Sequence, residues 1–136
     1  MGEPHVAVQG LRFCDTDMLG HVNNAVYSVM LEVGRAEMMR HTGLLDPRSG
    51  FGVVIARLEL DFLREMTWPG DIRIESELTR IADRSMHMRQ TLHQGDVLVA
   101  RARAVLAVID TTTRRAVPIA AQWRAILDRW LVPSPG

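Results

Sequence analysis

Apolar and polar residues alternate through most of the second half of the chain. From about residue 53 onward, apolar side chains recur at every second position, which is the spacing of strands with one buried face. They define four segments, whose apolar positions run over 58–62, 72–78, 86–92 and 100–108. The stretches WPGD, ADR and HQGD between them have the composition of turns. This pattern predicts antiparallel strands joined by short hairpins.

A helical repeat precedes the strands, and Gly43 is a suitable residue to end it. Apolar side chains recur at i, i+3, i+4 and i+7 spacing at Val26, Val29, Met30, Val33 and Ala36. The opposite side is also apolar, with Tyr27, Leu31 and Met38. A helix with so little polar circumference is expected to be covered on most sides.

Two weaker segments complete the pattern. Residues 5–13 are predicted to form a strand with a bulge at Gly10, because the apolar residues before and after this glycine have opposite parity. A short amphipathic C-terminal helix is predicted from Trp123, Ile126, Leu127 and Trp130.

The length of 136 residues fits one domain that spans positions 1–136. One long helix covers a sheet of this width only if the sheet curls around it. We therefore expect an α+β chain with the hot-dog fold, an antiparallel β-sheet wrapped around one long central helix. Strand edges left open in such a sheet are commonly used to pair subunits.

Charge and composition narrow the range of partners. Sixteen basic residues balance sixteen acidic ones, so no net field draws the chain to nucleic acid or to an anionic membrane. The single cysteine, Cys14, allows no internal disulfide and fits a reducing compartment. No signal-peptide pattern opens the chain, and nowhere do eighteen apolar residues run together. We expect a cytoplasmic protein that binds neither nucleic acid nor membrane.

The densest polar stretch, CDTDMLGHVNNAVY at 14–27, lies at the start of the helical repeat. It contains the D-x-D-x-x-G start of a calcium loop, but Leu19 stands where an oxygen ligand is needed and Val26 where the closing glutamate belongs. No second histidine lies near His21 to complete a transition-metal set. No metal is therefore expected.

Two other interpretations of this stretch remain. Asn23 or Asn24 can cap the helix, since an asparagine oxygen accepts a free backbone N–H. The same helix start offers N–H groups and a partial positive charge, which polarise a carbonyl and stabilise an oxyanion. A carboxylate upstream, kept partly dry by Met18, Leu19 and Val22, could act as nucleophile or as general base toward water. That combination suits acyl transfer to water.

The sequence RFCDTDMLGHVNNAVYSVMLEVGRAE, residues 12–37, closely resembles the 4-hydroxybenzoyl-CoA thioesterase family of hot-dog proteins. That family has an aromatic-x-D-x-D-x-x-G-[hydrophobic or His]-V-x-x-x-x-Y signature, and the GHVNN variant also resembles acyl-ACP thioesterases. The resemblance implies hydrolysis of a thioester of coenzyme A or of acyl carrier protein, without a cofactor. It implies Asp17 as the catalytic carboxylate, the N–H near Asn24 as the group that polarises the carbonyl, and Gly20 as the point of close backbone approach. His21 and Asn23 would shape the substrate site.

Other polar residues are assigned by their position. Asp15 is two residues before Asp17 on an extended segment, so it should point the other way and serve as a structural hydrogen-bond acceptor. Glu32 lies about two turns beyond Asn24 and either assists the site or pairs with Arg35 at i+3. Cys14 is interpreted as a small buried residue. Candidate contacts to a CoA phosphate, each also interpretable as a solvated charge, are Arg80, Arg84, Arg89, Arg101 and Arg103.

The leading hypothesis is an acyl-CoA thioesterase that forms a homodimer or homotetramer with active sites at the subunit interface. The alternatives are an acyl-ACP thioesterase and a non-catalytic acyl-CoA-binding hot-dog protein. A pure binder has no need of a carboxylate at the carbonyl, so Asp17 favours the enzyme. A hydratase is disfavoured because the chain lacks the histidine motifs that such proteins carry.

Overall fold

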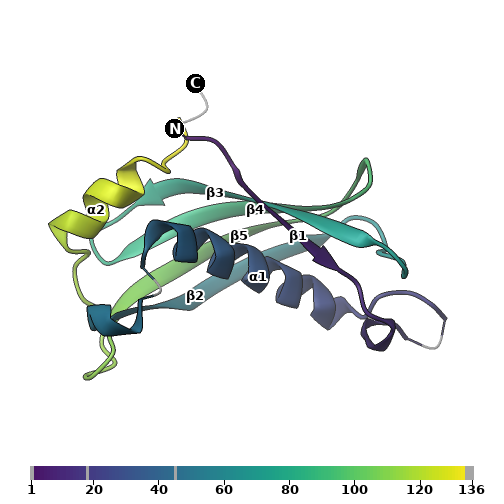
Figure 1. Ribbon diagram of the computed structural model, residues 1–136, viewed down its shortest axis with the longest axis horizontal. Helices are drawn as coiled ribbons and strands as arrows, with labels where there is room; N and C mark the ends of the chain where they lie inside the picture. The colour runs from purple at the N-terminus through teal and green to yellow at the C-terminus, as the bar shows by residue number, and fades with distance from the viewer. Residues whose placement is uncertain (1, 18, 45, 134–136) are drawn as a thin grey trace.

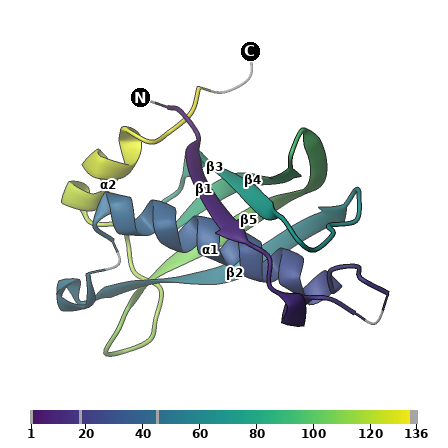
Figure 2. The same cartoon turned by 45° about the vertical axis from the view of Figure 1, so that its right-hand side comes forward.

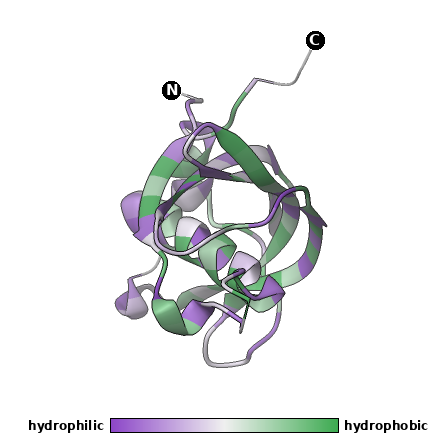
Figure 3. Ribbon diagram, turned by 90° about the vertical axis from the view of Figure 1, so that its right-hand side faces the viewer, coloured by the Kyte–Doolittle hydropathy of each residue, from purple (hydrophilic) through white to green (hydrophobic). Residues whose placement is uncertain are grey.

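The computed structural model describes residues 2–17, 19–44 and 46–133 (Figure 1). In chain order the elements are β1 (His5–Gly10), a 3₁₀ turn (Phe13–Asp15), α1 (Asn24–Thr42), a second 3₁₀ turn (Pro47–Ser49), β2 (Phe51–Phe62), β3 (Asp71–Ile81), β4 (Ser85–Gln94), β5 (Val97–Asp110) and α2 (Ala121–Asp128). Within these residues five strands form one antiparallel sheet in the order β1-β3-β4-β5-β2. The sheet is curved, with α1 on its concave side (Figure 3). The prediction of an α+β chain with an antiparallel sheet is confirmed.

The four predicted strands after residue 50 all form, and their apolar parity faces α1. On β5 the inward positions are small at Ala100, Ala102 and Ala104 and larger at Leu106 and Val108, and all are buried. The prediction that short hairpins join all four strands is wrong for one connection, however. β2 pairs with β5 at the far edge of the sheet, so residues 63–70 cross to β3 rather than closing a hairpin.

β1 is shorter than predicted and contains no bulge. Its pairing with β3 runs without a register shift from His5 opposite Ser76 to Gly10 opposite Asp71. The strand ends there, and Leu11 donates its N–H to Gly70 O at 2.9 Å before the chain turns into the 3₁₀ segment. The change of apolar parity at Gly10 therefore marks the end of a strand.

α1 contacts the sheet through a different face than its apolar repeat predicts. The buried residues are Tyr27, Met30, Leu31, Gly34, Met38, Met39 and Thr42. An exposed stripe runs along the other side through Ala25, Val29, Glu32, Ala36 and Arg40. Val29, which belongs to the predicted apolar face, is 50% exposed. The expectation that the helix is covered on most sides is thus wrong for the single chain.

Gly34 explains which face of α1 meets the sheet. A Cβ at this position would overlap Ile74 Cγ2 and lie 3.0 Å from both Gln90 Nε2 and Ser76 Oγ. The backbone of α1 accordingly comes nearest to β1, β3 and β4, while β2 extends along the exposed side of the helix (Figures 1 and 2).

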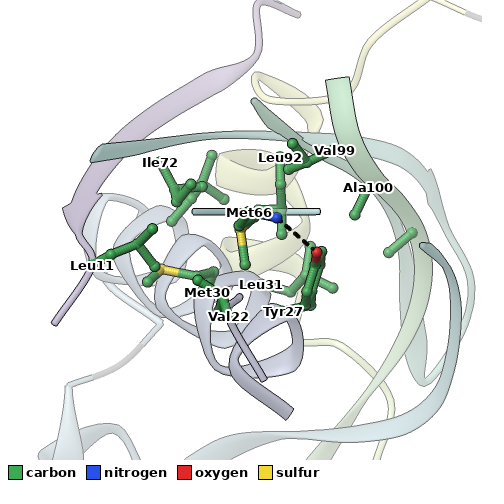
Figure 4. Packing of buried hydrophobic residues seen from close by; sticks show 12 residues of the cluster. Leu11, Val22, Tyr27, Met30, Leu31, Met66, Ile72, Leu92, Val99 and Ala100 are labelled. Atoms are coloured by element: carbon green, nitrogen blue, oxygen red, sulfur yellow. Dashed lines mark hydrogen bonds between the residues drawn. The ribbon is translucent and has the colours of Figure 1, made fainter. Parts of the chain in front are cut away.

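Two apolar clusters fill the space between α1 and the sheet. One surrounds the first turns of α1 and includes Tyr27, Leu31, Met66 and Leu92 (Figure 4). The other lies around Met38 and Met39 and receives Leu127 from α2. No helix in the described part of the chain is long and apolar enough to cross a membrane.

Candidate functional site

Asp15 holds the segment between β1 and α1. Its side chain is buried, and its two oxygens accept hydrogen bonds from Arg12 N at 2.8 Å and Arg12 Nη2 at 2.9 Å. Its backbone oxygen accepts from Asn23 N at 2.9 Å. The side-chain hydrogen bond from Arg12 is the main reason that the pKa of Asp15 lies below its ordinary value of 3.8. Asp15 is therefore a structural acceptor, as predicted, although it lies in a 3₁₀ turn and not on an extended strand.

Asp17 lies at the base of a short loop that folds around its carboxylate. Oδ1 accepts hydrogen bonds from Leu19 N at 2.7 Å and His21 N at 3.1 Å, and the backbone N–H of Asp17 donates to His21 O at 2.8 Å. Within the described residues, both hydrogen bonds to the Asp17 carboxylate use Oδ1, and neither uses Oδ2. The loop thus fixes one carboxylate oxygen and leaves the other to meet a ligand.

The expectation that apolar neighbours keep Asp17 partly dry is wrong for the single chain. Asp17 is exposed, and Leu19 beside it is 80% exposed. Val22 points into the core instead, and Met18 lies outside the described residues.

Gly20 allows the loop to close around Asp17. Its φ is +83°, in the left-handed region that disfavours residues with a Cβ, and among the described residues, its two chain neighbours aside, no atom lies within 4 Å of the position of a Cβ. Backbone conformation, rather than crowding, therefore accounts for glycine here.

His21 connects this loop to the segment that follows β2. Its Nε2 lies 3.1 Å from Glu65 Oε2, and its backbone forms an isolated bridge with Thr67. Gln94 fixes that segment in turn, because its amide accepts from Thr67 N at 3.0 Å and donates to Thr67 O at 2.7 Å. Nothing in the sequence indicates that Glu65 and Gln94 belong to the site, since only the folded register brings them near.

The start of α1 is open beside the loop. Asn23 occupies the N-cap position, but its side chain makes no capping hydrogen bond, so the predicted side-chain cap is wrong for Asn23. Its backbone oxygen accepts from Val26 N at 2.9 Å instead. The N–H groups of Asn24 and Ala25 have no acceptor within the described residues, and both residues are exposed. They form the partly positive end of a 19-residue helix.

Tyr27, in the first turn of α1, ties the helix to the chain after β2. Its hydroxyl donates to Arg64 O at 2.9 Å. It also accepts from Met66 N at 3.1 Å (Figure 4). Its ring meets Phe62 edge to face, with centroids 5.0 Å apart. The sequence motif includes this tyrosine, but only the structure shows what it bonds.

Glu32 and Arg35 lie farther along α1, beside a cavity of about 310 Å³. The cavity is lined by Glu32, Arg35, Ala36 and Met39 of α1 and by Val53, Ile55 and Leu106 of the sheet; we call it the α1–β2 cavity. The alternative of an ion pair between Glu32 and Arg35 is wrong, because the described residues place no carboxylate within 4.0 Å of Arg35. Arg35 Nη1 donates to Gln90 Oε1 at 3.2 Å instead.

The candidate phosphate contacts do not converge on the helix start. Arg89, Arg101 and Arg103 alternate with the inward-facing residues of β4 and β5, so they face away from α1. Arg89 pairs with Glu77, and Arg101 lies 3.5 Å from Asp61. Arg84 lies 3.4 Å from Asp83 in the β3–β4 turn, and Arg80 is exposed near the end of β3. Cys14, expected to be buried, is exposed.

The structure therefore brings together Asp17, Gly20, His21, Asn23 and Asn24, and leaves Glu32 two turns away. Within the described residues, no three His, Cys, Asp or Glu side chains are grouped closely enough to hold a metal ion. What remains, among the described residues, is an exposed carboxylate with one oxygen that accepts no hydrogen bond, and two N–H groups without acceptors at the start of the helix that follows. This pair of features can bind and polarise a carbonyl.

Comparisons with known proteins are consistent with this geometry. The family model described as "Thioesterase-like superfamily" matches residues 11–128. Among solved structures, the chain is similar to a predicted thioesterase from Bacillus stearothermophilus, with 30% identity and a TM-score of 0.86 over 98% of this chain and 99% of that one. No curated protein sequence matches the chain.

Two more distant structures share the fold. SAV2348 from Staphylococcus aureus, solved in complex with CoA, has 15% identity and a TM-score of 0.89 over 100% of this chain and 90% of that one. The Dynemicin thioesterase has 18% identity and a TM-score of 0.84, over 97% of this chain and 100% of that one.

Proposed function

Because the chain belongs to the thioesterase-like superfamily, we propose that it hydrolyses acyl-CoA thioesters to the free acid and CoA. The observation that carries the proposal is that one short segment joins Asp17, whose Oδ2 accepts no hydrogen bond from the described residues, to the open N–H groups of Asn24 and Ala25 at the start of α1. A thioester carbonyl bound at these N–H groups is polarised, and its oxyanion is stabilised by fixed donors and by the helix dipole.

Asp17 supplies the carboxylate by one of two routes. As a general base it takes a proton from water while the oxygen adds to the carbonyl carbon, and the tetrahedral intermediate then expels CoA thiolate, which recovers the proton. As a nucleophile it displaces CoA thiolate to form a mixed anhydride, which water hydrolyses to the free acid and the carboxylate. Both routes use the same oxygen and the same helix end.

The neighbouring residues act by positioning these groups. The hydrogen bonds from Leu19 and His21 fix the carboxylate plane, and Gly20 permits the turn that aims them. His21, tied to Glu65, forms one wall of the substrate site, and Asn23 presents its unbonded side-chain amide beside the carbonyl. Glu32, about 12 Å beyond Asn24 along the helix axis, contacts the acyl portion and not the reacting carbon.

A second copy of the chain completes the site. β2 is an edge strand of 12 residues with one side unpaired in the described chain, and Ile55 and Phe62 on its inner face are 46% and 51% exposed. Two such edges that pair across a two-fold axis extend the sheet and cover the exposed stripe of α1, which then acts as the central helix of the hot-dog fold. The same contact removes water from Asp17. We propose a homodimer, with a homotetramer as the next assembly.

CoA is the favoured donor, and acyl carrier protein is the alternative. The CoA complex of the Staphylococcus aureus protein supports a CoA site on this fold. The motif at 12–37 supports the more specific assignment to the 4-hydroxybenzoyl-CoA thioesterase family. The outward arginines of β4 and β5 remain candidate phosphate contacts.

Release of free thiol from a panel of aliphatic and aromatic acyl-CoAs tests the proposal. Asp17→Asn is expected to lower kcat by roughly 100-fold or more, the usual contribution of a positioned base. The matched control is Asp96→Asn, an exposed aspartate in the β4–β5 turn, which should retain the parent rate. Rapid quenching with mass spectrometry separates the routes, because only the nucleophilic one leaves an acyl group on Asp17.

Two results would contradict the proposed function. If Asp17→Asn hydrolyses its substrate as fast as the parent, Asp17 is not the catalytic carboxylate. If the parent binds acyl-CoA tightly and releases no thiol from any member of the panel, the chain is a non-catalytic acyl-CoA-binding protein.

A further inference from the structure

Arg35 has an unusual environment for an arginine. The residue is half-buried, and among the described residues its guanidinium makes one hydrogen bond, to Gln90 Oε1 at 3.2 Å. Burial is the main cause that lowers the pKa of Arg35 from its usual value, and the charge of Glu32 opposes this only in part. A partly desolvated guanidinium without a carboxylate partner is costly, because four of its five donors still need acceptors.

A buried polar network holds Arg35 in place. The amide of Gln90 donates to Leu31 O and to Ser76 Oγ, both at 2.9 Å, which leaves its oxygen for Arg35. Gly34 allows the helix to approach this network, since any side chain there would collide with Ile74. The guanidinium is therefore fixed at the wall of the α1–β2 cavity.

Apart from Glu32 and Arg35, the α1–β2 cavity is apolar. Ala36, Met39, Val53, Ile55 and Leu106 form the rest of its lining. Glu32 is exposed in the single chain, whereas Arg35 is half-buried and is the charge that the cavity partly encloses. An apolar space with one cation at its wall suits an aliphatic chain that ends in an anion.

The cavity is aligned with the proposed reaction site. Arg35 is eleven residues after Asn24, which is about 16 Å along the axis of α1. Exposed apolar side chains lie between them: Val29 is one turn before Glu32, and Phe62 meets Tyr27 of the first turn edge to face. An extended acyl chain whose thioester is bound at Asn24 follows these residues toward Arg35.

We propose that Arg35 binds a carboxylate at the far end of the acyl group, so that the preferred substrates are ω-carboxyacyl thioesters. This rests on the proposed function, since it assumes that the thioester lies at the start of α1. The planar guanidinium offers two parallel donors to a carboxylate, and Gln90 already orients it. A methyl-ended acyl group leaves those donors unpaired.

Pairs of CoA thioesters with equal carbon number, one ω-carboxylated and one methyl-ended, test the proposal over chain lengths of about six to fourteen carbons, a range chosen to span the helix distance. At the matching length the parent should favour the ω-carboxylated member by roughly 10- to 100-fold in kcat/KM, as expected for a hydrogen bond to a charged group. Arg35→Met should abolish this preference and improve the methyl-ended substrate. Arg35→Lys should retain part of it.

Arg129→Met, which removes an exposed arginine beyond α2, is the matched control and should show the parent's preference. The ratio of the two substrates is measured within one protein sample, so it is insensitive to partial unfolding. Equal kcat/KM for both members at every length, or a preference that survives in Arg35→Met, overturns the proposal. Loss of the dimer in Arg35→Met with an unchanged ratio also overturns it, because Arg35 would then serve the subunit contact.

A binding experiment separates failure of this inference from failure of the proposed function. Non-hydrolysable S-(ω-carboxyalkyl)-CoA and S-alkyl-CoA thioethers of equal length are titrated calorimetrically into the parent and into Arg35→Met. At least tenfold tighter binding of the carboxylated thioether by the parent alone supports the role of Arg35 even if no thioester is hydrolysed. Equal Kd values, or no binding of either thioether, contradict it.

Discussion

Gly34 of α1 faces Ile74 of β3 so closely that even a methyl group at position 34 would overlap the Ile74 side chain. This contact sets which face of the helix meets the sheet. It thereby determines that Val29, Glu32 and Ala36 remain on the open side.

Gly34→Ala is expected to destabilise the protein by about 1–3 kcal/mol, the usual cost of overpacking a core. Urea unfolding measures this cost. Gly10→Ala is the control, because a Cβ there lies 3.4 Å from its nearest neighbour and the φ is ordinary. In a double-mutant cycle, adding Ile74→Ala to Gly34→Ala should cost less than the sum of the single changes. Simple additivity would show that the two residues do not clash.

Asp15→Ala is expected to lower the free energy of unfolding by about 1–2 kcal/mol near neutral pH, because two hydrogen bonds from Arg12 are lost. The pKa of Asp15 is lowered in the folded protein, so its contribution is full above the ordinary value of 3.8 and disappears as the pH falls through the lower folded value. Urea titrations between about pH 3 and pH 7 should show parent and variant converging at the acid end. The exposed Asp128→Ala serves as control, and a gap that widens in acid would refute this role.

Tyr27→Phe should cost about 1–3 kcal/mol, since it leaves the buried N–H of Met66 without its acceptor. Thermal unfolding followed by circular dichroism measures the loss. Thr112→Val removes an exposed hydroxyl in the β5–α2 loop and should leave the midpoint unchanged. A midpoint of Tyr27→Phe equal to that of the parent would mean that water replaces the hydroxyl.

Gly20→Ala is expected to lower hydrolysis more than stability. A Cβ at φ +83° costs about 1–2 kcal/mol, and the loop can relieve this only by moving the N–H groups of Leu19 and His21 away from Asp17. Asparagine tolerates the left-handed region, so Gly20→Asn should retain more activity than Gly20→Ala. Steady-state kinetics measure kcat and KM for both variants. Equal losses of activity would mean that position 20 must lack a side chain, and that its backbone conformation is not the cause.

Val29→Glu and Ile55→Lys should convert the proposed dimer to monomers, because each places a charge on the exposed apolar surface between α1 and β2. Light scattering after size-exclusion chromatography measures the mass. Val97→Lys changes a similarly exposed valine in the β4–β5 hairpin and should remain dimeric. A parent that is monomeric at all concentrations would contradict the dimer itself.

Much of this fold is predictable because the sheet has one buried face. Period-two alternation identifies β2 to β5 and the inward residues of β5, and Gly43 ends α1 as expected, in the left-handed conformation. The position of β2 could not be read from the pattern. The stretch WPGD has the composition of a tight turn and so predicts that β2 pairs with β3. The observed pairing of β2 with β5 depends on long-range packing that no local sequence encodes.

The candidate site was predictable where it is contiguous in sequence. Asp17, His21 and Asn23 lie on one segment whose described residues bond to one another and to Asp15, so the motif alone groups these candidates. Glu65 and Gln94 join it only through the folded register. Ser76 and Gln90 did leave a signal, since each is a polar residue on the buried parity of its strand. Such interruptions of an apolar face identify buried polar networks, and here the network leads to Arg35.

The loop around Asp17 has a consequence for how this protein can evolve. The contacts of its carboxylate come from Leu19 and His21, only two and four residues away, whereas the α1–β2 cavity is formed by elements from distant parts of the chain. Substitutions at Val53 can therefore reshape the cavity without disturbing the contacts of the carboxylate. On the proposed function, reaction chemistry and acyl preference are then separately inherited traits of one small domain, and a duplicated copy can acquire a new substrate while retaining its means of hydrolysis.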